Sequence, residues 1–151
     1  MVIRDFEAKD FERIIEIDKL SYETPTPKQF VLDSILGGKA WVAVEDDQII
    51  GFIIGKVKHG TPYVNNVCLA PDHRGKGYAK LLFGKFEEVF GMNKNLEDRV
   101  YWLQVDSSNP AQKLYFDLGY RVGWIDQNYY GWSKHALCMY KSARPIVDFT
   151  R

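Results

Sequence analysis

A short loop with two glycines and two cations is the part of this sequence best suited to chemistry. Arg74, Gly75, Lys76 and Gly77 follow an apolar run that ends at Pro71, and an amphipathic segment begins near Gly77. Glycine has no Cβ, so the backbone of this loop can approach a ligand closely. The N–H groups of a helix's first turn, aided by the helix dipole and by either cation, would face an anion. The loop therefore predicts a phosphate site.

The spacing of the loop excludes two common phosphate motifs. The Walker pattern G-x-x-x-x-G-K-[ST] does not occur in the chain. The dinucleotide pattern G-x-G-x-x-G begins at Gly75 and Gly77, but position 80 is Lys, and no acidic residue ends a following parallel strand. The pattern that fits is [RQ]-x-x-G-x-[GA], which follows a strand ending in Ala-Pro.

This loop resembles the pyrophosphate loop of the GCN5-related N-acetyltransferases (GNAT), which use acetyl-CoA as the acetyl donor. The resemblance implies that the backbone of Val67, Cys68 and Leu69 pairs with the pantetheine arm, as an added strand would. It also implies that the pyrophosphate is held by Arg74, Gly75, Lys76, Gly77, Tyr78 and Ala79.

A second segment, 108–120, resembles the family pattern N-x-x-A-x-x-L-Y-x-x-x-G-[FY]. Asn109 stands six residues before Tyr115, where the family usually has seven, and Ser108 occupies the usual Asn position. Either residue is therefore a candidate contact to pantetheine. The resemblance implies that Tyr115 is the general acid, because a phenol can give or share a proton with a departing thiolate. The alternative is a helix tyrosine that only packs on the sheet.

Three residues point to the acceptor. Tyr129 and Tyr130 resemble the tyrosine pair that walls the peptide groove of the protein N-terminal acetyltransferases, and Glu23 lies where that group has its substrate loop. An aromatic hairpin and an exposed carboxylate remain the alternatives. Gln104 stands where these enzymes often have a Glu or His base, and an amide cannot take a proton at neutral pH. His135 is another candidate base, or a surface histidine.

The chemistry that the resemblance implies is acetyl transfer from acetyl-CoA to a primary amine, with the α-amine of a protein or peptide N-terminus as the preferred acceptor. An α-amine of pKa ~8 is about one-tenth neutral at pH 7, whereas a lysine of pKa ~10.4 is neutral to less than about one part in a thousand. A missing base therefore matters less for an α-amine. Two alternatives stay open: a polyamine or aminoglycoside acetyltransferase, and a catalytically silent acetyl-CoA-binding module.

The elements that must position these residues follow the order β-α-α-β-β-β-α-β-α-β-β. Periodicity and turn signals predict strands at 2–6, 39–45, 48–59, 63–70, 99–105, 120–125 and 135–141, with an Asp46-Asp47 hairpin turn. Helices are expected at 11–20, from an N-cap at Thr26 to Gly37, at 77–90 and at 110–118. The fold class is layered α/β, similar to GNAT, with a mixed sheet of six to seven strands and about four helices. Residues 1–141 form the expected acetyltransferase domain and 142–151 a tail.

Composition limits the remaining possibilities. The chain has 151 residues, a hydrophobic content of 46% and equal numbers of basic and acidic residues, 20 of each, so we expect one globular domain with no affinity for nucleic acid. No run approaches a membrane span of ~20 apolar residues or a signal peptide. Cys68 and Cys138 lack metal-ligand spacing and are expected to be reduced core residues. We therefore predict a cytoplasmic monomer or homodimer without metal or membrane contact.

Overall fold

Seven strands form one mixed sheet in the order β1-β2-β3-β4-β5-β7-β6. The computed structural model describes residues 1–21, 26–91 and 100–142. The strands are β1 (Val2–Asp5), β2 (Lys39–Glu45), β3 (Gln48–Lys58), β4 (Thr61–Leu69), β5 (Val100–Asp106), β6 (Arg121–Asp126) and β7 (Ala136–Ser142). The helices of the described residues are η1 (Ala8–Asp10), α1 (Phe11–Ser21), α2 (Lys28–Leu36), η2 (Pro71–His73), α3 (Tyr78–Gly91) and α4 (Gln112–Asp117). The predicted fold class is confirmed.

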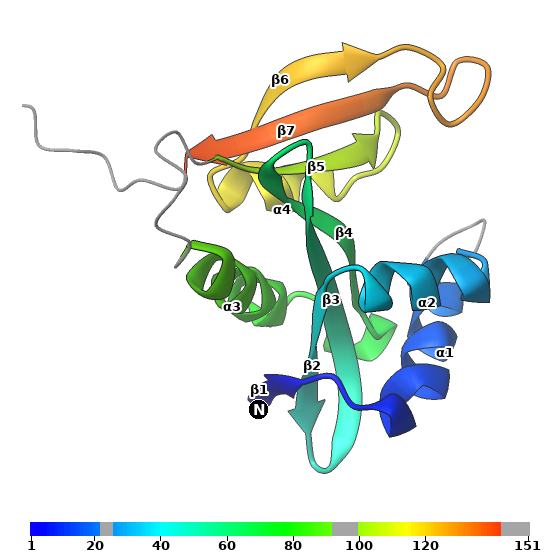
Figure 1. Cartoon of the computed structure of the whole chain (residues 1–151), viewed down its shortest axis with the longest axis vertical. Helices are drawn as coiled ribbons and strands as arrows, with labels where there is room; N and C mark the ends of the chain where they lie inside the picture. Colours follow the sequence, from blue (N-terminus) through cyan, green and yellow to red (C-terminus); the bar gives the residue numbers. More distant parts are fainter. Residues whose placement is uncertain (22–25, 92–99, 143–151) are drawn as a thin grey trace, which may run out of the picture.

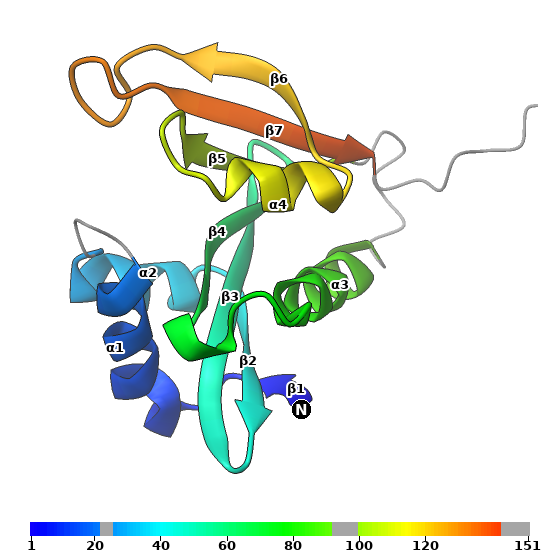
Figure 2. The same ribbon diagram turned by 180° about the vertical axis from the view of Figure 1, so that it is seen from behind.

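Helices cover both faces of the sheet (Figure 1; Figure 2 from behind). Strand β3 explains this arrangement, because its side chains alternate between two cores. Phe52 is buried in the cluster that contains residues of α1 and α2, whereas Ile53 is buried in the cluster that contains residues of α3 and α4. A strand buried on both faces reads as a continuous apolar run, as 49–54 does.

The sheet divides between β4 and β5. β3 and β4 pair antiparallel as far as Leu69. The parallel ladder between β4 and β5 has only two residue pairs, Tyr63 with Trp102 and Val64 with Leu103. Beyond these pairs the two strands part, while β5 continues to pair with β7 as far as Asp106. The second half of β4 and the end of β5 therefore border a split in the sheet.

A bulge in β4 lies at the start of this split. The register with β3 shifts between Ile54 and Gly55, so Asn65 is the extra residue. Its side-chain amide donates to Ser34 Oγ of α2 at 2.9 Å and to Asn66 Oδ1 at 2.6 Å. The bulge is thus tied to the helix layer, which fixes the direction in which β4 leaves its neighbour.

The expected start of the second helix is wrong in detail. The N-cap is Pro27, and Thr26 is not the cap. The Thr26 N–H and hydroxyl donate instead to the Asp18 carboxylate, at 2.9 and 3.0 Å. Asp18 is buried on α1, and burial raises its pKa. A buried carboxylate without hydrogen-bond donors is costly, whereas the N–H groups of a helix end can bond to water. Thr26 therefore donates to Asp18 and does not cap the helix.

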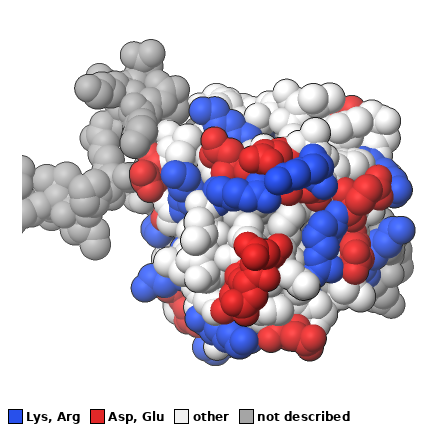
Figure 3. Space-filling model, turned by 90° about the horizontal axis from the view of Figure 1, so that it is seen from below, with Lys and Arg blue, Asp and Glu red and all other residues white. Residues whose placement is uncertain are grey.

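Several simpler expectations can be compared with the fold. Cys68 and Cys138 are buried and unbridged, as expected. Lys, Arg, Asp and Glu side chains alternate over the face in Figure 3, which carries no large patch of one sign. No helix of the described residues is long and apolar enough to cross a membrane. Residues 143–151 lie outside the described part, so the division into domain and tail stays a prediction.

Candidate active site

The predicted phosphate loop has the backbone that its glycines permit. It joins η2 to α3, and Gly75 and Gly77 have φ angles of +78° and +81°, in the left-handed region. A Cβ built on either glycine meets no heavy atom within 4 Å. The space beside the loop is therefore open, directly before the first turn of α3. These features suit a large anion such as a pyrophosphate.

The two cations of the loop have different surroundings. The Arg74 guanidinium donates from Nε to the Leu69 carbonyl and from Nη2 to Ser21 Oγ, both at 3.1 Å. Arg74 thus braces the loop against the ends of β4 and α1. Lys76 is exposed. The Tyr78 hydroxyl donates to Glu45 Oε1 at 2.8 Å, and this hydrogen bond raises the pKa of Tyr78.

The predicted pantetheine strand lies along the split. Val67, Cys68 and Leu69 follow the last residue of β4 that pairs with β5. The Cys68 side chain is buried towards α1 and α2, while Val67 and Leu69 pack against the other core. Their side chains are therefore structural. Any role in holding an extended ligand belongs to the backbone at this edge.

Tyr115 lies on α4, on the sheet face that α3 also covers. It is buried on α4 and packs on Phe83, with the ring centroids 5.8 Å apart. Burial, the nearby Cys68 thiol and the nearby Tyr130 hydroxyl raise the pKa of Tyr115. The raised pKa makes this phenol a weaker acid than a tyrosine in water. The structure thus places the predicted acid in the same core cluster as Val67 and Leu69 of the predicted cofactor strand.

Ser108 and Asn109 are both engaged in shaping the turn before α4. Ser108 donates from its backbone N and its Oγ to Asp106 Oδ1, at 2.8 and 2.7 Å, and these bonds lower the pKa of Asp106. The Asn109 side chain accepts the Ala111 N–H at 2.9 Å. The structure thus gives both candidates a turn-stabilising role.

The β6–β7 hairpin carries the predicted acceptor residues. Tyr129 and Tyr130 are partly exposed, and their rings meet edge to face with centroids 5.0 Å apart. Burial and the neighbouring Tyr129 raise the pKa of Tyr130 to about 12. His135 Nδ1 accepts the Asn128 N–H at 2.9 Å, so this nitrogen holds the turn. Glu23, the third predicted acceptor residue, lies outside the described residues.

A pocket of about 350 Å³ lies beside this hairpin, on the sheet face that α1 and α2 share. Tyr129 and Gln104 are among its lining residues. Sequence reasoning missed the others, which are Lys58, His59, Trp102, Trp124, Asp126, Cys138 and Tyr140. Most of them occupy alternate positions of β5, β6 and β7, so strand periodicity would have placed them on one face once the strand order was known.

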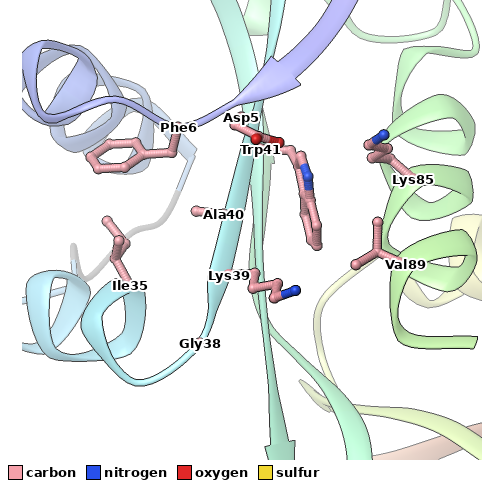
Figure 4. A pocket seen from close by; sticks show the side chains of 9 residues that line it. All are labelled: Asp5, Phe6, Ile35, Gly38, Lys39, Ala40, Trp41, Lys85 and Val89. Carbon is pink, nitrogen blue, oxygen red and sulfur yellow. The ribbon is translucent and has the colours of Figure 1, made fainter. Parts of the chain in front are cut away.

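A second pocket, of about 470 Å³, lies at the other end of the sheet. In Figure 4, Phe6 and Ile35 stand on one side of β2, and Lys85 and Val89 of α3 on the other. None of the residues singled out in the sequence lines it.

No group of three or more His, Cys, Asp or Glu side chains in the described ranges is arranged to hold a metal.

Known proteins are similar to this chain in sequence and in architecture. The model of the acetyltransferase (GNAT) family matches residues 4–120. The [ribosomal protein bS18]-alanine N-acetyltransferase of Haemophilus influenzae is 34% identical over 133 residues, which cover 85% of this chain and 87% of that protein.

Solved structures of other acetyltransferases are similar in fold. The ribosomal-protein-S18-alanine N-acetyltransferase from Escherichia coli has a TM-score of 0.81 at 19% identity, covering 98% of this chain and 97% of that one. An aminoglycoside 6'-N-acetyltransferase complexed with coenzyme A has a TM-score of 0.84 at 16% identity, covering 98% and 100%. At these identities the structures show the fold alone.

Proposed function

This chain belongs to the acetyltransferase (GNAT) family and is an acetyl-CoA-dependent N-acetyltransferase, and we propose that its acceptor is the N-terminal α-amine of a protein or peptide. The pocket beside the β6–β7 hairpin carries this proposal. Four aromatic side chains line it, together with Lys58 and with Asp126 as the one carboxylate that the described residues contribute. A polyamine or an aminoglycoside carries several positive charges and would be repelled by Lys58.

Acetyl-CoA supplies the acetyl group as a thioester. The N–H groups of the loop at Gly75 and Gly77, with Lys76, would hold its pyrophosphate, and the backbone of β4 beside the split would align its arm. Tyr115 would stand at the inner end of this path, near Cys68. Tyr115 is protonated at neutral pH, so its hydroxyl can donate a hydrogen bond to the departing sulfur and stabilise it.

The relationship to the Haemophilus enzyme supports an α-amine acceptor, since that enzyme's name identifies a protein alanine as its substrate. The pKa difference between the two kinds of amine supports it as well. A larger fraction of an α-amine is neutral at physiological pH, so it needs less help from a base than a lysine side chain does. Tyr129 and Tyr130 would wall the groove.

A panel of acceptors tests the proposal. Turnover of acetyl-CoA is measured with peptides that have a free N-terminus, with the same peptides blocked at the α-amine but carrying lysine, and with spermidine. We expect unblocked peptides to react fastest, with rates that rise as the pH approaches ~8. Equal rates on blocked lysine peptides would contradict an α-amine acceptor, and turnover of spermidine alone would establish the small-molecule alternative.

A further inference from the structure

Gln104 is a residue of β5 beside the split in the sheet. It is the first residue after Leu103, the last residue of β5 that pairs with β4, so it stands where the split begins. Its side chain points to the face that carries the aromatic pocket. An amide there cannot accept a proton from an attacking amine. The neighbours of this amide therefore determine what the position can do.

The Gln104 amide is oriented by its neighbours. Its Nε2 donates to Asp126 Oδ2 of β6 at 3.2 Å and to Cys138 Sγ of β7 at 3.4 Å. Its Oε1 accepts the Tyr63 hydroxyl of β4 at 3.4 Å. The amide nitrogen thus faces the carboxylate, and the amide oxygen faces the side of the split. Asp126 therefore favours this orientation of the amide over the flipped one, in which the amide oxygen would face the carboxylate.

The carboxylate of Asp126 has a second donor besides Gln104. Trp124 Nε1 donates to its Oδ1 at 2.8 Å, and the two residues lie on the same face of β6. Among the described residues, the titratable groups that line the pocket with Asp126 are Lys58, His59, Tyr129, Cys138 and Tyr140, and the Tyr63 hydroxyl of β4 reaches Gln104. Within the described part of the chain, Asp126 is the one carboxylate that lines this pocket.

We propose that Asp126 is a positioning residue for the acceptor amine: its carboxylate fixes the Gln104 amide so that Oε1 accepts a hydrogen bond from the amine, and its charge strengthens that bond. A carboxylate that accepts an amide N–H polarises the amide, which makes the carbonyl oxygen a better acceptor. The pair supplies the negative potential that a carboxylate at position 104 would supply directly. This inference holds for an α-amine or any other primary amine.

The role of the pair follows from the charges that change in the transfer. The nitrogen lone pair forms the bond to the acetyl carbon, and the carbon–sulfur bond breaks with its electron pair left on sulfur. One amine proton leaves nitrogen for water, and the sulfur gains one proton, so the balance is a thioester and an amine giving an amide and a thiol. Nitrogen becomes positive as it attacks, and a hydrogen bond to a polarised oxygen is strongest at that stage.

Exchanging the two side chains tests the inference. Asp126→Asn should lower kcat/KM for the acceptor by about 10- to 100-fold with no change in acetyl-CoA affinity by calorimetry. Gln104→Glu should also lose activity near neutral pH, because two carboxylates would face each other, and the pair would then titrate as a unit. The double variant restores one amide and one carboxylate with exchanged positions. We expect its activity to exceed the product of the two single losses by about tenfold or more.

Controls separate positioning from stability. Asp47→Asn makes the same chemical change in the β2–β3 turn, where φ is +62°, and should leave both kcat/KM and the melting temperature unchanged. The pH profile is the second readout: Gln104→Glu should add a titration to kcat/KM that the double variant lacks. If Asp126→Asn does not fold, Gln104→Met removes the amide, keeps the carboxylate and should cause the same loss. Wild-type kcat/KM in Asp126→Asn or in Gln104→Met, or a double variant equal to the product of the single losses, would overturn the proposal.

Discussion

Tyr115 combines two properties at the scale of a single residue. It is part of the core between α4 and α3, and it lies close to groups of the split. A raised pKa makes the phenol a weaker acid than in water. We therefore expect it to act chiefly as a donor to the sulfur as negative charge develops there, and less as a source of a fully transferred proton.

Tyr115→Phe removes only the hydroxyl and keeps the ring against Phe83. We expect kcat to fall by roughly 10²–10⁴-fold, with little change in KM for acetyl-CoA, since the hydroxyl acts mainly as charge develops. Steady-state kinetics with chemistry shown to be rate-limiting is the measurement. An unaltered kcat would leave Tyr115 as a packing residue.

At the scale of elements, the loop before α3 has a left-handed glycine backbone and is the proposed binding site for the pyrophosphate of acetyl-CoA. Gly77→Val should cost stability, because a branched side chain is strained at φ of +81°, and should abolish most acetyl-CoA affinity by filling the open space beside the loop. Gly60→Val is the matched control, with φ of +78° and equally open surroundings in the β3–β4 turn. It should lower the melting temperature similarly and keep the affinity measured by calorimetry.

The junction of β1 and α1 depends on one buried carboxylate. Asp10 is 3% exposed and accepts two hydrogen bonds from Arg4 of β1, at 2.8 and 2.9 Å, and one from the Glu7 N–H at 2.8 Å. The bond from Arg4 is the main reason that the pKa of Asp10 is lowered. Its pairing therefore favours the folded chain only while the carboxylate is ionised.

Asp10→Asn should lower the free energy of unfolding at pH 7 by about 1–3 kcal/mol, because the charged bonds to Arg4 are lost. The stabilisation by Asp10 is fully present above the unfolded-state pKa of ~3.9 and disappears as the pH falls through the lower folded-state value. Urea unfolding of both proteins between pH 7 and pH 3 measures this. A difference between them that stays constant with pH would refute the ion pair as its cause.

At the scale of the whole molecule, the split between β4 and β5 brings distant segments together. The hairpin that carries Tyr129 and Tyr130 lies on the same side of the molecule as α2 (Figures 1 and 2). The pocket beside it is lined by residues of β3, β5, β6 and β7. An acceptor bound there would contact elements from the middle and the end of the sequence.

Removing hydroxyls from this wall tests its contribution to acceptor binding. Tyr129→Phe or Tyr130→Phe should raise KM for the peptide by roughly 2- to 12-fold, the cost of one hydrogen bond, and leave acetyl-CoA binding unchanged. Tyr101→Phe is the control, because its hydroxyl bonds the Glu87 carbonyl on the other face of the sheet. An equal rise of KM in the control would mean that the hairpin tyrosines do not contact the acceptor.

Local features were readable in the sequence because neighbouring residues determine them. The Asp46-Asp47 turn has φ angles of +51° and +62°, and the glycines of the phosphate loop are left-handed, as their types suggest. Strand and helix periods also follow from the chain itself, which is why the element order could be predicted, while the family and the acetyl donor were implied by the resemblance of two local motifs, 74–79 and 108–120. The individual site residues stay predictions.

Tertiary structure decided the features that depend on which strands become neighbours. Thr26 serves Asp18 and not its own helix, because folding buries that carboxylate eight residues earlier. Gln104 meets Asp126 only because β7 returns beside β5 and β6 pairs with β7. Nothing in the sequence around Asp126 indicates that it will bond to Gln104. Hydrogen bonds between side chains of different strands depend on strand order and register, and these are determined by the whole fold.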